Sequence, residues 1–444
     1  MSTVLLTIGA GILLLVILIS VLKFNAFLSM LLVSLLIALI ALPAAEVVPA
    51  LTTGFGNTMK SIGIIIILGS IIGILLEKTG ATLSIAAAIV RMTGMKRAGL
   101  AAGMTGFITG IPIFCDSGFI VLSGVNRSLA LRSGKPMVYM ATLLAAGLYS
   151  VHCLIPPHPG AMAAAGIMKN SVGTQILAGL LVALPATFAG FAWARLMCRK
   201  EFRQPQPAGV SADAVLSTDS AVVPPVWKSL LPVLVPLMLI SIRSILLLYA
   251  SSSPSILERI LLMIGYPETA LLVGIGLAML LLPGTEIKKV NLFIEEAIQK
   301  AGPVLILTAA GGALGNVIRA AGIGDEAGKY LPLAQWGLLV PFLIAVFLKT
   351  AQGSSTIAIM TAASIVFPLL PALHLDSENG RLLATLAMGA GSMAISYAND
   401  SFYWVVTKFS GINPSDALRV YSTATLIMSL TAMAIVFGIS LIVL

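Results

Sequence analysis

The stretch VHCLIPPHPG, residues 151–160, interrupts an apolar run that begins near Pro136. Its three prolines lack backbone donors and restrict the residues before them, so a helix that enters the stretch cannot continue. Two imidazoles, His152 and His158, lie at this break. A second broken stretch, 394–404, lies near the other end of the chain. Inside a hydrophobic protein, irregular backbone is tolerated where it is buried in protein or lines a wet cavity. The two breaks therefore predict an internal site.

The composition places nearly all of the chain in lipid. Of the 444 residues, 58% are hydrophobic and 10% are charged, and the mean hydropathy is +1.05. A soluble domain carries about 25% charged residues. The run Thr3–Leu22 has no charge and is about long enough to span a bilayer. It lacks the basic start and the small-residue cleavage site of a signal peptide, so we interpret it as a retained helix.

The net charge of +9 does not indicate nucleic acid, because Lys and Arg fall in short loops between apolar runs, as the positive-inside rule expects. The three cysteines, Cys115, Cys153 and Cys198, have no CxxC spacing, which argues against a disulfide framework and a thiolate metal site. The sequence contains no HExxH motif and no P-loop. We therefore expect no cofactor, no metal, no enzymatic activity and no direct use of ATP.

Basic residues indicate the sides of the membrane. A cluster from Arg195 to Arg203 leads into a linker rich in Pro, Ser and Ala, 201–225, which we predict to be flexible and cytoplasmic. Basic clusters also flank 99–125 on both sides. Both ends of that segment are then cytoplasmic, so we predict a re-entrant hairpin that folds back near Gly110–Asp116. Residues 81–92 are too short to span and are predicted to lie at the membrane interface.

The two halves of the chain resemble each other. Three glycines of the first half recur in the second at one constant offset: Gly69, Gly73 and Gly80 match Gly311, Gly315 and Gly322. We therefore predict a tandem repeat, 1–200 and 226–444. The apolar segments on which the count of spans rests are 3–22, 26–46, 61–76, 99–125, 136–155, 174–198, 227–250, 266–283, 302–318, 336–370, 381–402 and 418–444.

Counting 99–125 and 336–370 as hairpins leaves five spans in each half, and an odd number inverts the second copy. Inverted repeats with broken helices and midplane sites are typical of secondary transporters. The predicted fold class is an all-α polytopic membrane protein with two inverted-topology repeats. Each repeat is expected to hold about five transmembrane helices plus one re-entrant hairpin.

The tips of the predicted hairpins carry polar groups. Asp116 lies in GIPIFCDSGF, where a carboxylate at membrane depth is costly and usually functional. The structural alternative is a cap of the helix that follows. Lys349 lies in FLKTAQGSSTIA, and its alternative to binding an anion is to reach the membrane interface. We predict an anion site here, because a helix start would expose backbone N–H groups in the turn formed by Gly353, Ser354, Ser355 and Thr356.

The second broken stretch contains Asn399 and Asp400, in SYANDSFYW. Amide and carboxylate oxygens at a helix break can hold Na⁺, accept a proton or orient a hydroxyl group, and the alternative is a mutual cap. His152 and His158 are interpreted either as a proton relay or substrate contacts, or as structural imidazoles. Zinc would need a third ligand. Arg243, inside the apolar segment 227–250, needs a partner or a short path to the interface.

Four stretches together resemble the gluconate permease family of bacterial inner-membrane symporters: GIPIFCDSGF, HCLIPPHPG, AQGSSTIA and GAGSMAISYANDSFYW. The resemblance runs from about residue 50 to the C-terminus. It implies inward transport of gluconate and related sugar acids or hydroxy acids with protons, with a D-amino acid as substrate in one branch. It also implies inverted repeats with paired hairpins. The residues that fall on family motif positions are Asp116, His152, His158, Asn399, Asp400 and the turn 353–356.

The chain departs from the family pattern beside the expected site. Cys115 stands where members often have an aromatic residue, Ala161 where they often have Pro, and Tyr397 where they often have His. These differences concern the identity of the substrate rather than the family.

The residues and the resemblance predict a secondary active symporter for a small organic anion, working by alternating access in the bacterial inner membrane. Lys349 and the turn would hold the carboxylate, and Asn399 and the two histidines would contact hydroxyls. Asp116 or Asp400 would load the coupling proton, since neutralising a buried carboxylate lowers the cost of moving it. The alternatives are a Na⁺-coupled carboxylate or D-amino-acid transporter and a passive channel. A homodimer through the first two helices and 227–283 is also expected.

Overall fold

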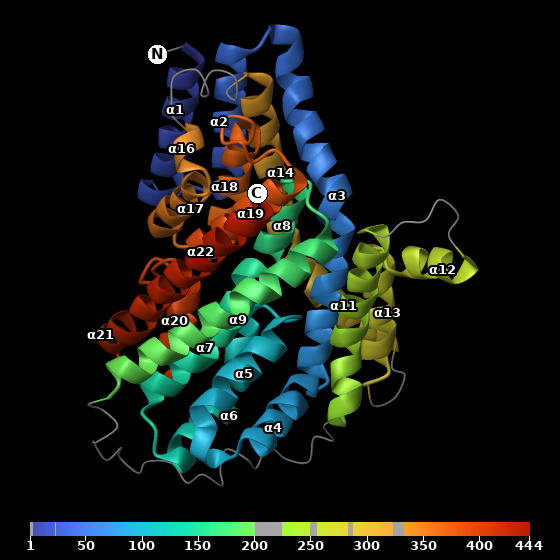
Figure 1. Cartoon of the computed structure of the whole chain (residues 1–444), viewed down its shortest axis with the longest axis vertical. Helices are drawn as coiled ribbons and strands as arrows, with labels where there is room; N and C mark the ends of the chain where they lie inside the picture. Colours follow the sequence, from blue (N-terminus) through green and yellow to red (C-terminus); the bar gives the residue numbers. More distant parts are fainter. Residues whose placement is uncertain (1–2, 23, 200–223, 249–254, 283–286, 323–332) are drawn as a thin grey trace.

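The computed structural model describes residues 3–22, 24–199, 224–248, 255–282, 287–322 and 333–444 (Figure 1). Within these residues all regular secondary structure is helical and no strand occurs, which confirms the predicted all-α class. The predicted linker, 201–225, lies outside the described residues except for its last two. Its flexibility and the division of the chain around it stay predictions.

The helices before the linker are α1 (Thr3–Val16), continued by η1 (Ile17–Val21), α2 (Ala26–Ala41), α3 (Ala44–Lys78), α4 (Ala81–Thr93), η2 (Met95–Arg97), α5 (Ala98–Gly110), α6 (Cys115–Ser133), α7 (Met137–Leu154), α8 (Pro159–Ile167) and α9 (Val172–Met197). Local chemistry explains several of their ends. The Asn25 side chain accepts a hydrogen bond from the Leu28 N–H and so begins α2. Gly134 ends α6 with a φ of 62°, a conformation that glycine adopts at low cost.

The helices after the linker are α11 (Val226–Leu248), α12 (Ile256–Ile264), α13 (Pro267–Met279), α14 (Ile287–Ala320), α16 (Leu333–Trp336), α17 (Leu339–Gln352), α18 (Ser355–Val366), η4 (Phe367–Leu369), α19 (Glu378–Ser392), α20 (Ser401–Ser410), α21 (Pro414–Ala417), η5 (Leu418–Ser422) and α22 (Thr423–Val443). A capping box between Ser255 and Glu258 begins α12. Most helical stability here comes from packing, because the longer helices lie against one another (Figure 1).

The chain is a polytopic helical protein. In the described part, five helical segments are long and apolar enough to cross a membrane, and two bent pairs raise the number to seven. The bends are 43° within α3 and 75° between α12 and α13. The prediction of five spans in each half is not tested by this count, because α1, α2, α17 and α18 are each shorter than a full span.

Two boundaries differ from the prediction. The apolar segment 26–46 contains a helix end, because α2 stops before Pro43 and α3 continues without interruption to Lys78. The segment predicted at 302–318 begins much earlier, since α14 starts at Ile287. The first turns of α14 carry charged residues, so no apolar run marks them. They are helical nonetheless, and Lys300 pairs with Glu296 one turn away at 3.0 Å.

The helices break at all four predicted stretches. The hairpin predicted near Gly110–Asp116 corresponds to the end of α5 and the start of α6, which pack against each other. The second corresponds to the junction of α17 and α18. The two remaining breaks separate α7 from α8 and α19 from α20. The re-entrant course of the hairpins and the inverted relation of the halves stay predictions.

Helix α7 lies at the centre of the fold. Every residue from Val138 to Leu154 is buried, so no side chain in that range faces outward. Gly147 lies against the backbone of α5, where a side chain would collide with Phe107 and its neighbours. On its other side Ser150 hydrogen bonds to Thr187 of α9 at 2.5 Å. Figure 1 shows α22, α9, α7 and α5 as neighbouring tilted helices. This packing fixes the break that follows α7.

Candidate functional site

A buried ion pair joins α17 to the start of α20. The Lys349 Nζ lies 2.6 Å from the Asp400 Oδ2, and the two side chains are 0% and 5% exposed. The Ser396 hydroxyl donates to the same oxygen at 2.5 Å, and the Phe402 N–H donates to Oδ1 at 3.0 Å. Asp400 is therefore the N-cap of α20 and the counter-charge of Lys349.

The Lys349 ammonium has several partners within the protein. It also donates a hydrogen bond to the Gly353 carbonyl, and it lies 5.7 Å from the ring centroid of Tyr149 on α7. A charge buried this deeply is tolerated only when it is paired and hydrogen-bonded. The first role that the structure gives to Lys349 is thus to neutralise Asp400.

The turn between α17 and α18 is tightly packed against the second broken stretch. Gly353 adopts a φ of 85°, and a Cβ at this position would collide with the backbone of Asn399. The Asn399 amide donates to the Thr350 carbonyl at 2.9 Å, whereas its buried Oδ1 has no hydrogen-bond partner among the described residues. The Ser354 hydroxyl accepts from the Ile357 N–H and caps α18. These contacts fix the start of α18 in place.

The two histidines have different surroundings. The His152 Nε2 lies 3.2 Å from the Thr356 hydroxyl, and its Nδ1 has no partner in the described part of the chain. The His158 Nε2 donates to the Gly110 carbonyl at 2.6 Å, which ties the start of α8 to the end of α5. Their ring centroids are 4.9 Å apart. His152 is thus available to a ligand, whereas His158 is engaged in the structure.

Asp116 lies in the first turn of α6 and has an unsatisfied oxygen. Its Oδ1 is buried without a hydrogen-bond partner among the described residues. A buried carboxylate oxygen without a partner is costly, so it marks a site where a proton, an ion or a ligand group is expected. Asp116 and Asp400 are therefore held very differently.

A cavity of about 390 Å³ brings the motifs of both halves together. Its volume is in the range typical of small-molecule sites. Its wall includes six of the ten predicted site residues: Asp116, His152, Ser354, Ser355, Thr356 and Asp400. The other four are not part of its lining: His158, Lys349, Gly353 and Asn399. Two departures from the expected family pattern also touch the site, since Cys115 lines the cavity and the Tyr397 hydroxyl donates to the Thr350 carbonyl.

Lys300, on α14, also lines the cavity and was not predicted. Its Nζ lies 3.0 Å from Glu296, and Glu296 in turn pairs with Lys78 of α3 at 2.9 Å. The Glu77 Oε2 lies 4.0 Å from the Lys300 Nζ. The only sequence signal for Lys300 is the spacing of Glu296 and Lys300, which is also that of an ordinary exposed helix face.

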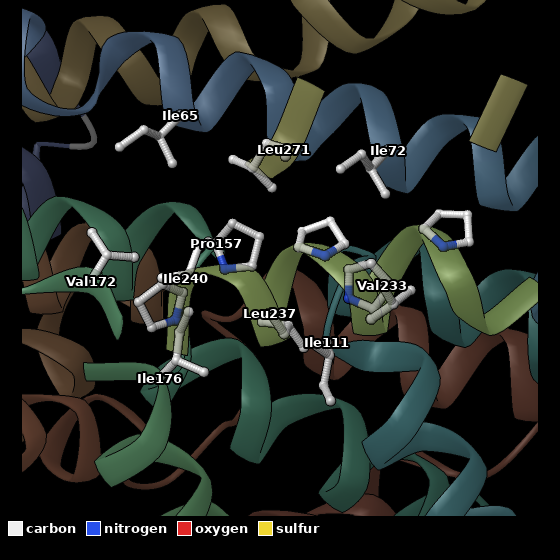
Figure 2. A pocket seen from close by; sticks show the side chains of 15 residues that line it. Ile65, Ile72, Ile111, Pro157, Val172, Ile176, Val233, Leu237, Ile240 and Leu271 are labelled. Carbon is white, nitrogen blue, oxygen red and sulfur yellow. The ribbon is translucent and has the colours of Figure 1, made fainter. Parts of the chain in front are cut away.

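A second, apolar cavity lies beside the Pro156–Pro157 break (Figure 2). It has a volume of about 30 Å³, and all fifteen residues that line it have apolar side chains or are glycine. Figure 2 shows Ile65 and Ile72 of α3 facing Val233 and Leu237 of α11. A charged group would find no polar partner here, so this cavity is not a site for an anion.

Arg243, on α11, has an aromatic partner. Its guanidinium carbon lies 3.9 Å from the ring centroid of Tyr266, at the junction of α12 and α13. Such a cation–π contact accounts for an Arg within an apolar segment.

The sequence model of a family described as GntP family permease matches residues 3–442. The chain belongs to the GntP family of permeases. This confirms the resemblance given by the four motifs. Since the members of this family are permeases, the chain is a transporter and not an enzyme.

Relatives of this permease cover most of its length. An uncharacterized permease of Haemophilus influenzae is 33% identical over 88% of this chain and 82% of its own. An inner membrane permease of Escherichia coli is 30% identical over 96% of both chains. A gluconate permease of Pseudomonas aeruginosa is 29% identical over 96% of this chain and 95% of its own. Two Escherichia coli relatives are named as transporters of L-idonate and of D-serine. The permease is accordingly a multi-pass protein of the inner membrane.

Proposed function

We propose that this permease is a secondary active symporter that imports gluconate or a related sugar acid or hydroxy acid with protons. The names of its relatives support the substrate class. The observation that carries the proposal is the cavity, which combines the start of α18, three hydroxyls and an imidazole with a carboxylate that lacks a partner. A sugar acid presents one carboxylate and several hydroxyls, which matches these groups.

The start of α18 is the proposed site of the substrate carboxylate. The first N–H groups of a helix have no partner within it, and the macrodipole favours an anion there. Ser354, Ser355 and Thr356 line the cavity at this end. His152 lies beside Thr356, so the substrate hydroxyls are placed against His152. Lys349 contributes indirectly, because its ion pair with Asp400 cancels the negative charge of that carboxylate.

Asp116 is the proposed proton site. Lys349 balances the charge of Asp400, and Glu296 balances that of Lys300. Asp116 is then the carboxylate whose charge remains uncompensated in the cavity wall. An anion about 6 Å from an ionised Asp116 would be repelled by roughly 3 kcal/mol at an effective dielectric constant of about 20. A proton on Asp116 removes that repulsion, so proton and anion enter together.

The proposed mechanism is alternating access between two inverted repeats, 1–200 and 226–444. The α5–α6 and α17–α18 pairs would be their re-entrant hairpins, and both pairs contribute to the cavity. The alternative is a Na⁺ ion held by Asp116 and neighbouring oxygens, with a carboxylate or a D-amino acid as substrate. We also propose a homodimer through α1, α2 and α11–α13.

Uptake of labelled gluconate into proteoliposomes tests the proposal. An inward-directed proton gradient without sodium should drive accumulation by the unchanged protein. Asp116→Asn should abolish this accumulation while it retains exchange of labelled for unlabelled gluconate, because exchange needs binding but no proton release. Asp376→Asn, at an exposed carboxylate outside the cavity, is the matched control and should accumulate gluconate normally.

Uphill, proton-driven accumulation by Asp116→Asn would refute the role of Asp116. Accumulation that requires sodium would instead favour the Na⁺-coupled alternative. If gluconate is not taken up but another hydroxy acid or D-serine is, that compound replaces gluconate as the proposed substrate. The roles of the site residues are then tested with it.

A further inference from the structure

A further polar cavity, called the Lys169–Arg319 cavity, lies beside the C-terminal end of α14. It has a volume of about 190 Å³, and α3, α8, α14 and η4 contribute to its wall. Two cations line it, Lys169 and Arg319, together with Asn57, Thr58 and Ser61. Within the described part of the chain, the lining contains no Asp or Glu. The wall therefore carries positive charge and hydrogen-bond donors, which is the chemistry that recognises a carboxylate.

The two cations are held at the wall by neighbouring groups. The Arg319 Nη2 donates to the Asn316 Oδ1 at 2.6 Å, and the Asn316 amide donates to the Ala50 carbonyl of α3 at 2.7 Å. The Lys169 Nζ lies 5.6 Å from the ring centroid of Phe367. Neither contact is an ion pair, and among the described residues no carboxylate pairs with either cation, so both positive charges face the cavity as possible partners of an anion.

This cavity is aligned along α14 with the cavity of about 390 Å³ described above, which is called the transport cavity from here on. Lys300 and Arg319 mark their two ends on α14, and these residues lie roughly 28 Å apart at 1.5 Å per residue. That is about the thickness of the hydrocarbon core of a bilayer. Helix α8 also contributes to both walls, with Pro159 at one end and Gly166 at the other. The two cavities therefore follow one another along α14 and α8, and only their outer ends are this far apart.

Close helix packing separates the cavities. The Thr308 hydroxyl of α14 contacts the Met360 sulfur of α18, and both side chains are buried. Gly311 and Gly315 allow α14 to pack closely against Ser364 of α18. A solute in the Lys169–Arg319 cavity therefore passes directly between α14 and α18 to the transport cavity only when these two helices move apart.

We propose that the Lys169–Arg319 cavity is a capture site for the carboxylate of a small organic anion, on the face opposite to the mouth marked by Lys300. The proposal rests on the proposed function, because it supplies the transport cavity with its substrate. Positive charge in a concave wall raises the local concentration of anions and speeds their entry, and salt weakens this effect.

The local field can be measured without any transport. Ser61→Cys places a near-isosteric thiol in the wall, and the rates of its modification by an anionic and by a cationic methanethiosulfonate reagent are compared in the full-length protein. The same reaction on the unchanged protein, whose three cysteines are buried, gives the background. Adding Lys169→Gln and Arg319→Gln should lower the anionic-to-cationic rate ratio about threefold or more at 0.1 M salt. Adding Lys96→Gln, at an exposed lysine of η2 outside the lining, should leave the ratio unchanged.

The same Lys169→Gln and Arg319→Gln substitutions, with Ser61 retained, should raise the KM for labelled gluconate several-fold at low salt and leave kcat unchanged. The difference in KM should shrink in 1 M salt. A rate ratio that is the same with and without the two cations overturns the proposal, as does a lowered ratio with an unchanged KM. If the unchanged protein does not transport gluconate, the proposed function fails by itself, and the thiol reaction still decides whether the cavity attracts anions.

Discussion

Asp400→Asn is expected to destabilise the protein more than the double substitution Lys349→Met with Asp400→Asn. The single change keeps a side chain able to cap α20, since Asn is as good an N-cap as Asp. It removes the counter-charge of Lys349, whose side chain is 0% exposed, and the acceptor of the Ser396 hydroxyl, and the second of these losses is shared with the double variant. The ammonium then remains in the interior without its partner. The double variant removes both charges and keeps the volume of the lysine side chain close to its original value.

The magnitude follows from the geometry of the pair. At the observed N–O distance of 2.6 Å, an effective dielectric constant of about 20 gives a direct attraction of roughly 6 kcal/mol. Desolvation offsets part of this, and removing one partner of such a pair typically costs about 3–5 kcal/mol. Replacing both partners together typically costs little, so we expect about 1 kcal/mol for the double variant. The coupling free energy should therefore exceed about 2 kcal/mol.

Reversible unfolding in mixed micelles, followed by tryptophan fluorescence, would give the free energies of a double-mutant cycle with Lys349→Met as the fourth variant. The matched control is the Lys78–Glu296 pair, which has a similar distance of 2.9 Å but side chains 34% and 32% exposed. Its coupling should stay below about 1 kcal/mol. Additive effects at Lys349 and Asp400, or coupling no larger than that of the control pair, would refute the reasoning.

Two further predictions concern the turn and the histidines. Gly353→Ala should lower stability by more than 2 kcal/mol and prevent uptake, because the methyl group meets Asn399 and a φ of 85° alone costs an L-residue roughly 1–2 kcal/mol. Gly411→Ala, with a φ of 65° and open space around it, should show only the conformational cost when its unfolding is measured in the same mixed micelles. His158→Gln should mainly lower stability, whereas His152→Gln should mainly raise the KM for the transported anion several-fold. Equal effects of the two histidine variants on KM would contradict the separate roles given to them.

The motifs located the helix breaks because such breaks depend on local chemistry. Pro156 and Pro157 follow the end of α7, Pro159 begins α8 and Gly353 ends α17, so sequence reasoning located these breaks. Burying polar backbone in a membrane protein then requires that the breaks meet around a common interior. Asp116, His152 and Asp400 accordingly line one cavity, although they belong to different halves of the chain.

The pairing of charges could not be predicted in the same way. Lys349 and Asp400 are 51 positions apart, and no periodicity connects two residues at that separation. The sequence therefore left Lys349 as a possible anion ligand and did not separate Asp116 from Asp400. Lys300 was missed because a charged helix face looks the same whether it borders water or a cavity. The Lys169–Arg319 cavity was missed because its residues belong to four separate regions of the chain.

The complete enclosure of α7 bears on how the protein is made. Synthesis delivers α7 to the membrane before α18, α19 and α20 exist, yet Tyr149 and His152 find partners there, at Ser392 and Thr356. Until the second half arrives, these polar groups face lipid or the translocation machinery, which is unfavourable. An N-terminal fragment ending after α9 should be degraded when expressed alone and protected when the remaining fragment is supplied separately. The most central helix of the fold is thus fully enclosed only after the second half has been synthesised, and until then it is exposed to the proteases that remove incomplete membrane proteins.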